Sequence, residues 1–438
     1  MKVAENGAES QLTVKKIFWF WVPLAAMWIV MAIEHPMITA MIARIPNAEI
    51  NLAAFGLSFS LSLIMESPII MLFTAATALA RDKCSYRVLL RFTNRLSLAL
   101  TLLHLLIALT PAFELIVRRL IGAPAEIVAP ARRAFILMFP WAAAIAYRRL
   151  WQGVLIRFKR TGVVPFTLVS RLLMSLTVMA AGFAAGIVCG AEIGALALSV
   201  GSIASAGTAF AFYRPVGRIM ETRLPGYEPL SRRRLLGFYI PLALTTFITM
   251  MGQPLVAVGL ARAAQPLASL AVWPVLMGAM FIGRALGLSF QEVVVALLED
   301  AGSFRSLRSF SLRLGLFLTL LMAGFTFSPA ARLWFARVAG LSPRLAAFTL
   351  TPARIMIFLP ALEAALSFLR GVQVHLRRTA LITRSVLLNV GVLSAVLFAG
   401  TTLLSLSGAA VAALALTAAL TADSLFLAAF TRGRDLAA

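Results

Sequence analysis

The sequence predicts an all-α polytopic membrane protein with about twelve transmembrane helices. Of its 438 residues, 61% are hydrophobic and only 13% are charged. Soluble domains carry about 25% charged residues, so this chain has too few charges to cover a surface in contact with water. Apolar stretches of about twenty residues recur along the whole chain, and a helix of that length crosses the hydrocarbon core of a bilayer.

Twelve apolar segments fit this description, six on each side of a basic connector that also contains proline and glycine. Such composition is typical of a linker between helix bundles. The sequence therefore predicts an N-terminal six-helix lobe at 1–213, a cytoplasmic linker at 214–232 and a C-terminal six-helix lobe at 233–438. The segments are 17–38, 51–80, 91–117, 134–157, 163–189, 193–213, 233–262, 266–298, 305–328, 344–371, 378–400 and 406–430.

The distribution of basic residues predicts the orientation in the membrane. If the N-terminus is cytoplasmic, 23 lysines and arginines fall in cytoplasmic segments and nine in external segments. Cytoplasmic loops carry the excess of basic residues in membrane proteins, so we expect both termini in the cytoplasm, in a plasma or bacterial inner membrane. The net charge of +23 then reflects topology and anionic lipid head groups, and we expect no nucleic-acid partner.

The two halves of the chain look like copies of each other. A shift of 218 residues brings prolines, arginines and glycines of the first half onto the same residue types in the second half. Because each half has an even number of segments, both copies enter the membrane from the same side. We therefore predict a pseudo-two-fold axis along the membrane normal, with a solute site between the halves. The matched pairs include Pro23 and Pro241, Pro36 and Pro254, Arg44 and Arg262, and Gly153 and Gly371.

Several segments resemble the progressive ankylosis protein family. The resemblance implies membership of the MOP superfamily of twelve-helix exporters, a MATE-like V-shaped bundle, and export of small organic or phosphate-bearing anions. The same superfamily contains lipid flippases and multidrug antiporters, which remain alternatives. The resembling segments are 52–61 with Ser67-Pro68, Arg133-Ala134-Phe135 with Phe139-Pro140, Phe238 with Pro241-Leu242-Ala243-Leu244, Pro254-Leu255-Val256 with Arg262, and Arg354-Ile355 with Phe358 and Pro360.

Arginines outnumber carboxylates at bilayer depth, eight against five. Charged side chains are costly in lipid and by default face a cavity or a partner. A surplus of cations suits an anionic solute, and the arginine guanidinium can grip a carboxylate or phosphate with two hydrogen bonds. The alternative is a structural network of ion pairs. The candidate substrate-binding residues are Arg148, Arg149, Gln152, Gln253, Arg284, Glu363 and Arg370.

Glu34 and His35 are the candidates for ion coupling, just before Pro36. Histidine titrates near neutral pH, and a neighbouring carboxylate can raise its pKa, which suits a proton relay. The alternative is an ion pair at the outer membrane interface, because the predicted helix ends at residue 38.

Glu66 is a candidate gating residue, because it corresponds to Arg284 at the 218-residue shift. Residues related by a two-fold axis lie at equal depth on opposite sides of that axis. We therefore predict that Glu66 and Arg284 pair when the cavity closes around them. The alternative is that Glu66 turns toward Arg148 or Arg149.

No enzyme motif is present. The sequence has neither a phosphate-binding G-x-x-x-x-G-K-[ST] loop nor a zinc-binding His-Glu-x-x-His pattern, and we expect neither enzymatic activity nor a cofactor. The predicted function is a secondary active transporter that exports a small anion by alternating access through a basic central cavity. Its expected partners are a small anionic solute or an anionic lipid, a coupling H⁺ or Na⁺, and membrane lipids around a monomer. An intramembrane enzyme or a scaffold without transport activity is the alternative from another class.

Overall fold

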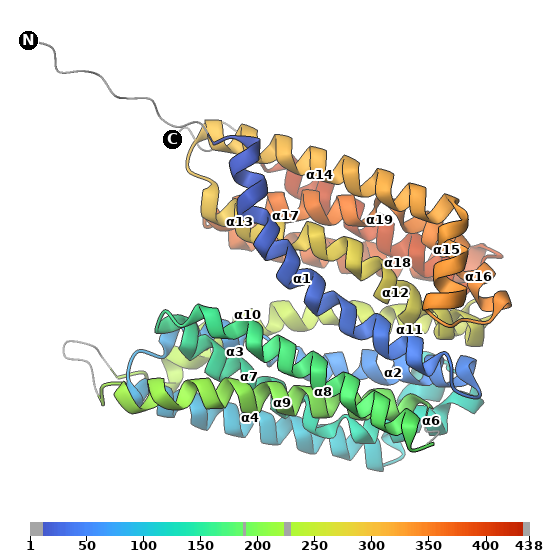
Figure 1. Ribbon diagram of the computed structural model, residues 1–438, viewed down its shortest axis with the longest axis horizontal. Helices are drawn as coiled ribbons and strands as arrows, with labels where there is room; N and C mark the ends of the chain where they lie inside the picture. The colour runs from blue at the N-terminus through green and yellow to red at the C-terminus, as the bar shows by residue number, and fades with distance from the viewer. Residues whose placement is uncertain (1–11, 187–189, 223–228, 432–438) are drawn as a thin grey trace, which may run out of the picture.

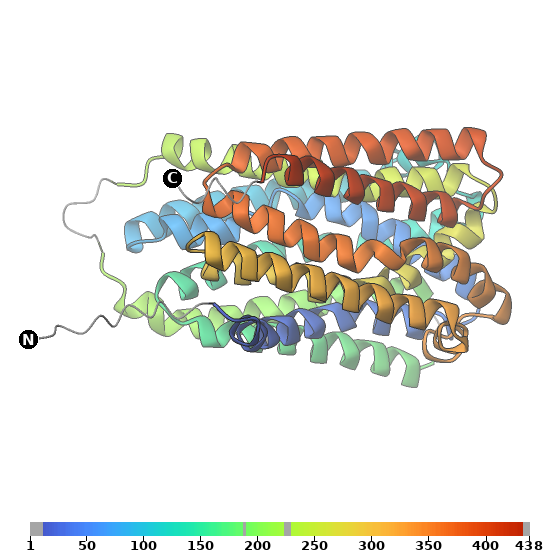
Figure 2. The same cartoon turned by 90° about the horizontal axis from the view of Figure 1, so that it is seen from above.

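The computed structural model describes residues 12–186, 190–222 and 229–431. Within these residues the regular elements are helices, and twelve spans are long and apolar enough to cross a membrane. The predicted all-α fold with twelve transmembrane helices is therefore confirmed. Two groups of helices meet at one end and separate toward the end that holds both termini, and their axes run roughly parallel (Figures 1 and 2). Some predictions fall outside the described residues. These are the segment end at 189, the linker at 223–228, and the basic residues Lys2, Arg432 and Arg434.

The first half follows the predicted segments, three of which are broken. The segment 91–117 is broken at residues 110–111 and the segment 134–157 at residue 138. The segment 51–80 is two helices, and the predicted linker begins inside the last helix of this half. The elements are α1 (Val14–Ile42), α2 (Ala48–Glu66), α3 (Leu72–Leu79), α4 (Lys83–Leu109), α5 (Ala112–Glu114), η1 (Leu115–Ile121), α6 (Ala125–Leu137), α7 (Phe139–Arg157), η2 (Thr161–Val163), α8 (Val164–Ala184) and α9 (Gly190–Ile219).

The second half repeats this order with three differences: two helices, at 232–250 and 252–262, correspond to α1, a 3-10 helix is added at 356–358, and η2 has no counterpart. Its elements are α10 (Arg232–Met250), α11 (Gly252–Arg262), α12 (Pro266–Leu288), α13 (Phe290–Leu297), α14 (Ala301–Phe327), α15 (Pro329–Leu333), η3 (Trp334–Val338), α16 (Pro343–Ile355), η4 (Met356–Phe358), α17 (Leu359–His375), α18 (Thr379–Leu403) and α19 (Gly408–Ala429).

The 218-residue repeat extends to details of the backbone. The helices α4 and α14 each begin after an aspartate whose carboxylate accepts a hydrogen bond from the backbone of a serine three residues later, at Asp82 and Asp300. Such a capping box satisfies amide groups that the first turn of a helix leaves free. Residues in the left-handed region also recur at this shift, in the pairs Asn47 and Gln265, Lys159 and Arg377, and Gly122 and Gly340.

Breaks in two helices free backbone carbonyls for contacts between the halves. Pro68 lies between α2 and α3, where a proline cannot donate the backbone hydrogen bond that would continue the helix. Its carbonyl accepts a hydrogen bond from the hydroxyl of Tyr239 on α10. At the related break between α12 and α13, the carbonyl of Leu286 accepts from Nε1 of Trp21 on α1, at 3.3 Å. Trp21 and Tyr239 correspond at the 218-residue shift.

The first helix of each half packs partly on the other half. On α1, the ring of Trp21 lies 5.8 Å from that of Phe310 on α14, between centroids. On α10, the ring of Tyr239 lies 4.8 Å from that of Phe92 on α4, which is the equivalent contact. Figure 1 shows α1 running from one group of helices to the other. The division into lobes at 1–213 and 233–438 stays a prediction, and this crossing was not predicted.

Two arginines join the halves at the end opposite the termini. Nη2 of Arg44, just after α1, donates to the carbonyl of Arg337 in η3 at 2.6 Å. Nη2 of Arg262, at the end of α11, donates to the carbonyl of Leu120 in η1 at 2.6 Å. The last carbonyls of a helix have no partner within the helix, so each arginine caps a π-helix of the opposite half. We call Arg44 and Arg262 the two arginine latches.

A glycine makes room for each latch. Gly340 has φ of 76°, and an added Cβ would lie 2.8 Å from Nη1 of Arg44. Gly122 has φ of 86°, and its Cβ would lie 3.3 Å from Cγ of Arg262. Glycine adopts this left-handed backbone without steric cost, so it both ends the π-helix and admits the arginine.

Helix packing at two related glycines leads to a first prediction. A Cβ at Gly153 on α7 would lie 2.6 Å from that of Ala76 on α3, and one at Gly371 on α17 would lie 2.7 Å from that of Val294. We expect Gly153→Leu to lower the melting midpoint in detergent, because overpacking costs about 1–3 kcal/mol or more. Gly207→Leu, with nothing within 4 Å of its Cβ, is the control. Equal midpoints for the two variants would contradict this packing.

Candidate functional site

A cavity of about 270 Å³ lies between the two halves. Glu34, His35 and Arg171 line it from the first half, and Gln253 and Arg284 line it from the second half. The remaining wall is mostly apolar and includes aromatic rings. Binding sites for small molecules are usually apolar cavities with a few polar groups that orient the ligand. This cavity is therefore the candidate site for a solute.

An ion pair between Glu34 and Arg171 forms the charged part of the first half's wall. Nε of Arg171 donates to Oε1 of Glu34 at 3.1 Å, and Nη2 lies 2.8 Å from Oε2. The hydroxyl of Ser175 donates to the same Oε1 at 2.8 Å. Glu34 is buried, and α1 continues to Ile42, beyond the predicted end at residue 38, so Glu34 does not lie at the end of its helix.

His35 faces the cavity between two phenylalanines. Its ring centroid lies 5.6 Å from that of Phe55 and 4.9 Å from that of Phe59, both on α2. Its Nε2 is buried and has no hydrogen-bond partner among the described residues. A buried polar atom without a partner costs free energy. In this conformation the nitrogen is covered by neighbouring atoms, so a solute in the cavity does not reach it.

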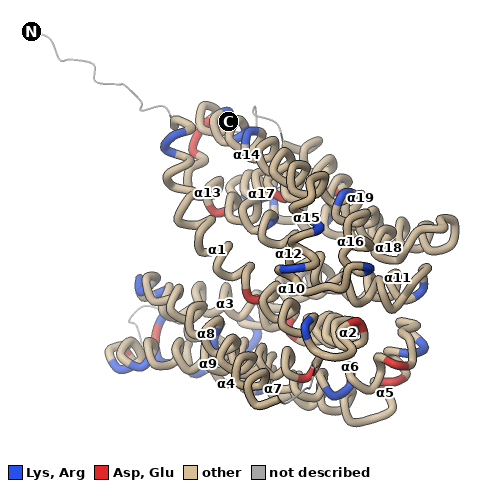
Figure 3. Tube along the Cα trace, turned by 45° about the vertical axis from the view of Figure 1, so that its right-hand side comes forward, with Lys and Arg blue, Asp and Glu red and all other residues tan. Residues whose placement is uncertain are grey.

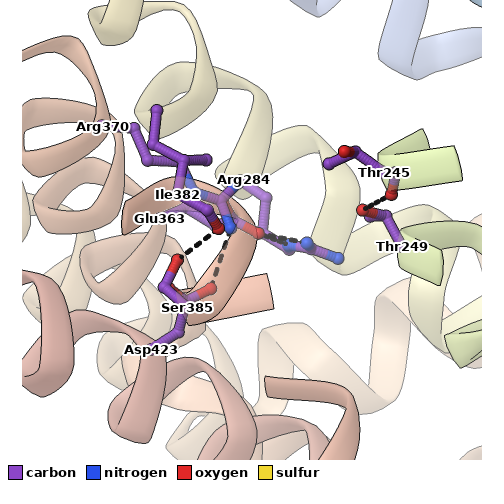
Figure 4. Close-up of polar contacts among 8 residues, drawn as sticks. All are labelled: Thr245, Thr249, Arg284, Glu363, Arg370, Ile382, Ser385 and Asp423. Carbon is purple, nitrogen blue, oxygen red and sulfur yellow. Dashed lines mark hydrogen bonds and ion pairs between the residues drawn. The ribbon is translucent and has the colours of Figure 1, made fainter. Parts of the chain in front are cut away.

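In the second half, Arg284 pairs with Glu363. Nε of Arg284 donates to Oε1 of Glu363 at 3.0 Å, and Nη2 donates to the same oxygen (Figure 4). Glu363 lies on α17. From the same helix, Nη2 of Arg370 donates to Oδ2 of Asp423 on α19 at 2.8 Å. The candidates Glu363 and Arg370 thus belong to two separate ion pairs. Of the four residues in these pairs, Arg284 lines the cavity.

The predicted pair between Glu66 and Arg284 is absent from the described ion pairs of this conformation. Each residue has a closer opposite charge within its own half. Arg284 pairs with Glu363, and Glu66 lies near enough to Arg148 and Arg149 for electrostatic attraction to both. In this conformation Glu66 therefore lies near Arg148 and Arg149, as in the alternative given in the sequence analysis.

Arg148, Arg149 and Gln152 lie in the interior of the first half and do not line the cavity. Nη1 of Arg148 donates to Oε1 of Gln152 at 3.4 Å, and Nε2 of Gln152 donates to Oγ1 of Thr167 at 2.6 Å. The Nε atoms of both arginines are buried without a partner among the described residues. Three arginines of the first half, Arg148, Arg149 and Arg171, therefore share two nearby carboxylates, Glu34 and Glu66, which leaves one positive charge in excess.

Arg171 lines the cavity but was not selected as a candidate from the sequence. The repeat offered one signal, because 168–171 align with 381–384 and end on an arginine in both copies. However, Arg384 is exposed on α18, so the repeat alone does not identify a cavity residue. Among the residues that the structure describes, no three His, Cys, Asp or Glu side chains gather closely enough to hold a metal ion.

Residues 8–283 match the family described as progressive ankylosis protein, over more than half of the chain. No curated protein sequence matches the chain. Among solved structures, an inward-facing multidrug resistance MATE transporter of the MOP superfamily is 12% identical with a TM-score of 0.63, covering 97% of this chain and 98% of that chain.

Two further solved structures share the fold. The lipid II flippase MurJ, in an inward closed conformation, is 12% identical with a TM-score of 0.74, covering 96% of this chain and 89% of that chain. A MOP superfamily transporter from Pyrococcus furiosus, described as having a binding pocket of reverse polarity, is 16% identical with a TM-score of 0.62, covering 97% and 96%. At these identities the likeness shows the fold alone.

Proposed function

We propose that this chain, which belongs to the progressive ankylosis protein family, is a secondary active transporter that exports a small organic or phosphate-bearing anion. One observation carries the proposal: Arg171 from the first half and Arg284 from the second half face the same cavity. Alternating access needs a ligand that contacts both halves, because only then does binding bias their relative movement. The guanidinium group suits carboxylate and phosphate ligands.

The charges behind the wall support an anion over a cation. Each cavity arginine carries its own carboxylate, Glu34 or Glu363, so the cavity itself is close to neutral. Behind the wall, Arg149 is attracted by Glu66, and Arg148 by Glu66 and by the Glu34 that already pairs with Arg171, so one positive charge remains in excess and acts on the cavity through a medium of low dielectric. A positive potential in a cleft concentrates anions and repels cations. A multidrug antiporter for cations would have the opposite arrangement.

The test uses purified protein in liposomes. We expect export of one or more anions from a panel of labelled dicarboxylates, tricarboxylates and phosphates, at rates above those of empty liposomes. A lipid flippase is the second candidate, because the lipid II flippase has the TM-score of 0.74 given above. Scrambling of a fluorescent anionic lipid without export of any soluble anion would support the flippase and contradict the proposal.

We further propose that both termini and the connector are cytoplasmic. Both termini lie at one end of the bundle (Figure 1), and charged segments are scattered over a mostly uncharged trace (Figure 3), so the proposed orientation rests on the 23-to-9 distribution of basic residues. In a variant with Cys84 and Cys189 replaced, we expect Thr222→Cys in the connector to resist an impermeant thiol reagent in intact cells. Leu120→Cys, an exposed site at the opposite end, should be labelled. Labelling of Thr222→Cys from outside would reverse the orientation.

A further inference from the structure

The two ion pairs of the cavity indicate which anions it takes and what moves with them. Resting on the proposed function, we propose that the cavity binds a divalent anion, with one anionic group on Arg171 and the other on Arg284. As the anion displaces them, Glu34 and Glu363 each take up one proton from solvent. The bonds formed are the O–H bonds of the two protonated carboxylates, and the two protons taken up balance the two negative charges of the anion.

In each pair the arginine is the more accessible member. The side chain of Arg171 is 17% exposed and that of Glu34 is 11% exposed. The side chain of Arg284 is 16% exposed and that of Glu363 is 5% exposed. An anion that enters the cavity therefore meets the guanidinium groups before it meets the carboxylates.

Each guanidinium also has donors to spare. A guanidinium has five N–H donors. In the described hydrogen bonds and ion pairs, Arg171 uses Nε and Nη2 toward Glu34, and Arg284 uses Nε and Nη2 toward Glu363. In both, Nη1 is left for an incoming oxygen. An anion can thus dock on the arginine first and displace the carboxylate afterwards.

Displacement would leave a carboxylate without its counterion, which is costly at bilayer depth. Protonation removes that charge. The charged and titratable groups around Glu34 are His35 on its own helix, Arg171 on α8, Arg148 on α7 and, in the shared cavity, Arg284 on α12. Those around Glu363 are Arg284 on α12, Arg370 on its own helix, Asp423 on α19 and Glu292 on α13.

None of the neighbouring arginines is a free replacement for the displaced one, and His35 can supply a positive charge only by taking up a proton itself. Arg370 is held by Asp423, and Glu292 interacts with Trp28 on α1. Arg148 is attracted by Glu66 as well as by Glu34. A proton from solvent is therefore the remaining source of neutralisation for both carboxylates.

Proton uptake makes anion binding depend on pH. By reciprocity, if anion binding raises the proton affinity of the carboxylates, then protons raise the affinity for the anion. Lowering the pH therefore tightens binding, by about tenfold per pH unit for each proton taken up, as long as the anion itself stays ionised. A monovalent anion engages one arginine and is linked to one proton at most.

Calorimetry with succinate and butyrate tests this inference, because the two have the same chain length and differ in one carboxylate. Titrations in buffers of different ionisation heat count the protons taken up. We expect about two protons per succinate for the unchanged protein, and about one for Glu34→Gln, whose amide still bonds Arg171 and Ser175. Glu114→Gln, in an exposed pair with Arg118, is the matched control and should give about two.

The outcomes separate this inference from the proposed function. Succinate binding without proton uptake, or equal affinity for butyrate, would overturn the inference. So would a failure of succinate to bind. In each of these cases export of other anions by the liposomes would leave the proposed function standing. A protein that exports none of the anions in the panel would overturn both.

Discussion

Export is expected to fall roughly 10- to 150-fold when Arg284 and Glu363 are both replaced by glutamine, because a charge-assisted hydrogen bond contributes about 1.5–3 kcal/mol. The Arg284→Gln/Glu363→Gln variant keeps two polar side chains that can bond each other, so the protein should stay folded. Arg284→Gln alone leaves the buried carboxylate of Glu363 without its partner and should lower the melting midpoint as well, since such loss costs about 3–5 kcal/mol.

The measurement is initial anion export in liposomes, with the melting midpoint of each variant recorded in detergent. The control is Arg133→Gln/Glu192→Gln, which neutralises a pair on the surface of the first half, where the side chain of Arg133 is 60% exposed. This control should transport at the unchanged rate. Export near that rate by the Arg284→Gln/Glu363→Gln variant would show that Arg284 does not bind the anion.

Removing both arginine latches is expected to open the end of the bundle opposite the termini. Each exposed latch contributes about 1 kcal/mol through hydrogen bonds from a charged donor, so Arg44→Ala/Arg262→Ala should shift the equilibrium roughly 30-fold toward the open conformer. Spin labels at Leu115 and Leu333 report it, because these exposed residues correspond at the 218-residue shift. The distance between the labels should increase in the double variant, and each single variant should give about half the free-energy change.

Arg118→Ala is the control for the latches. Arg118 lies in η1, next to the carbonyls that accept hydrogen bonds from Arg262. However, Arg118 itself pairs with Glu114 of its own half, at 2.9 Å. Its replacement should leave the distance between the labels unchanged. If the double latch variant also leaves that distance unchanged, then the arginines do not hold the end opposite the termini closed.

The twelve spans and the repeat were predictable because hydropathy and residue matches are local properties of the sequence. The crossing of α1 and α10 was not predictable in this way. Trp21 and Tyr239 lie within apolar stretches that would suit lipid, the same half or the other half equally well. Lipid tails are as apolar as leucine, so hydropathy contains no signal for which helices become neighbours.

The cavity was predictable in part for the same reason. Glu34, His35, Gln253 and Arg284 were selected from the sequence, and all four line it. Helical periodicity gives the angle between two residues on one helix but not the helix that each one faces. Charge surplus alone could not separate Arg171, which lines the cavity, from the buried arginines of α7 behind its wall.

The most direct measurement of the central claim is an experimental structure of the protein with succinate bound. We predict that the ligand lies between the halves, with one carboxylate on Arg171 and the other on Arg284, and that both guanidinium groups have moved away from Glu34 and Glu363. Succinate held within the first half beside Arg148 and Arg149, with both cavity ion pairs intact, would contradict it.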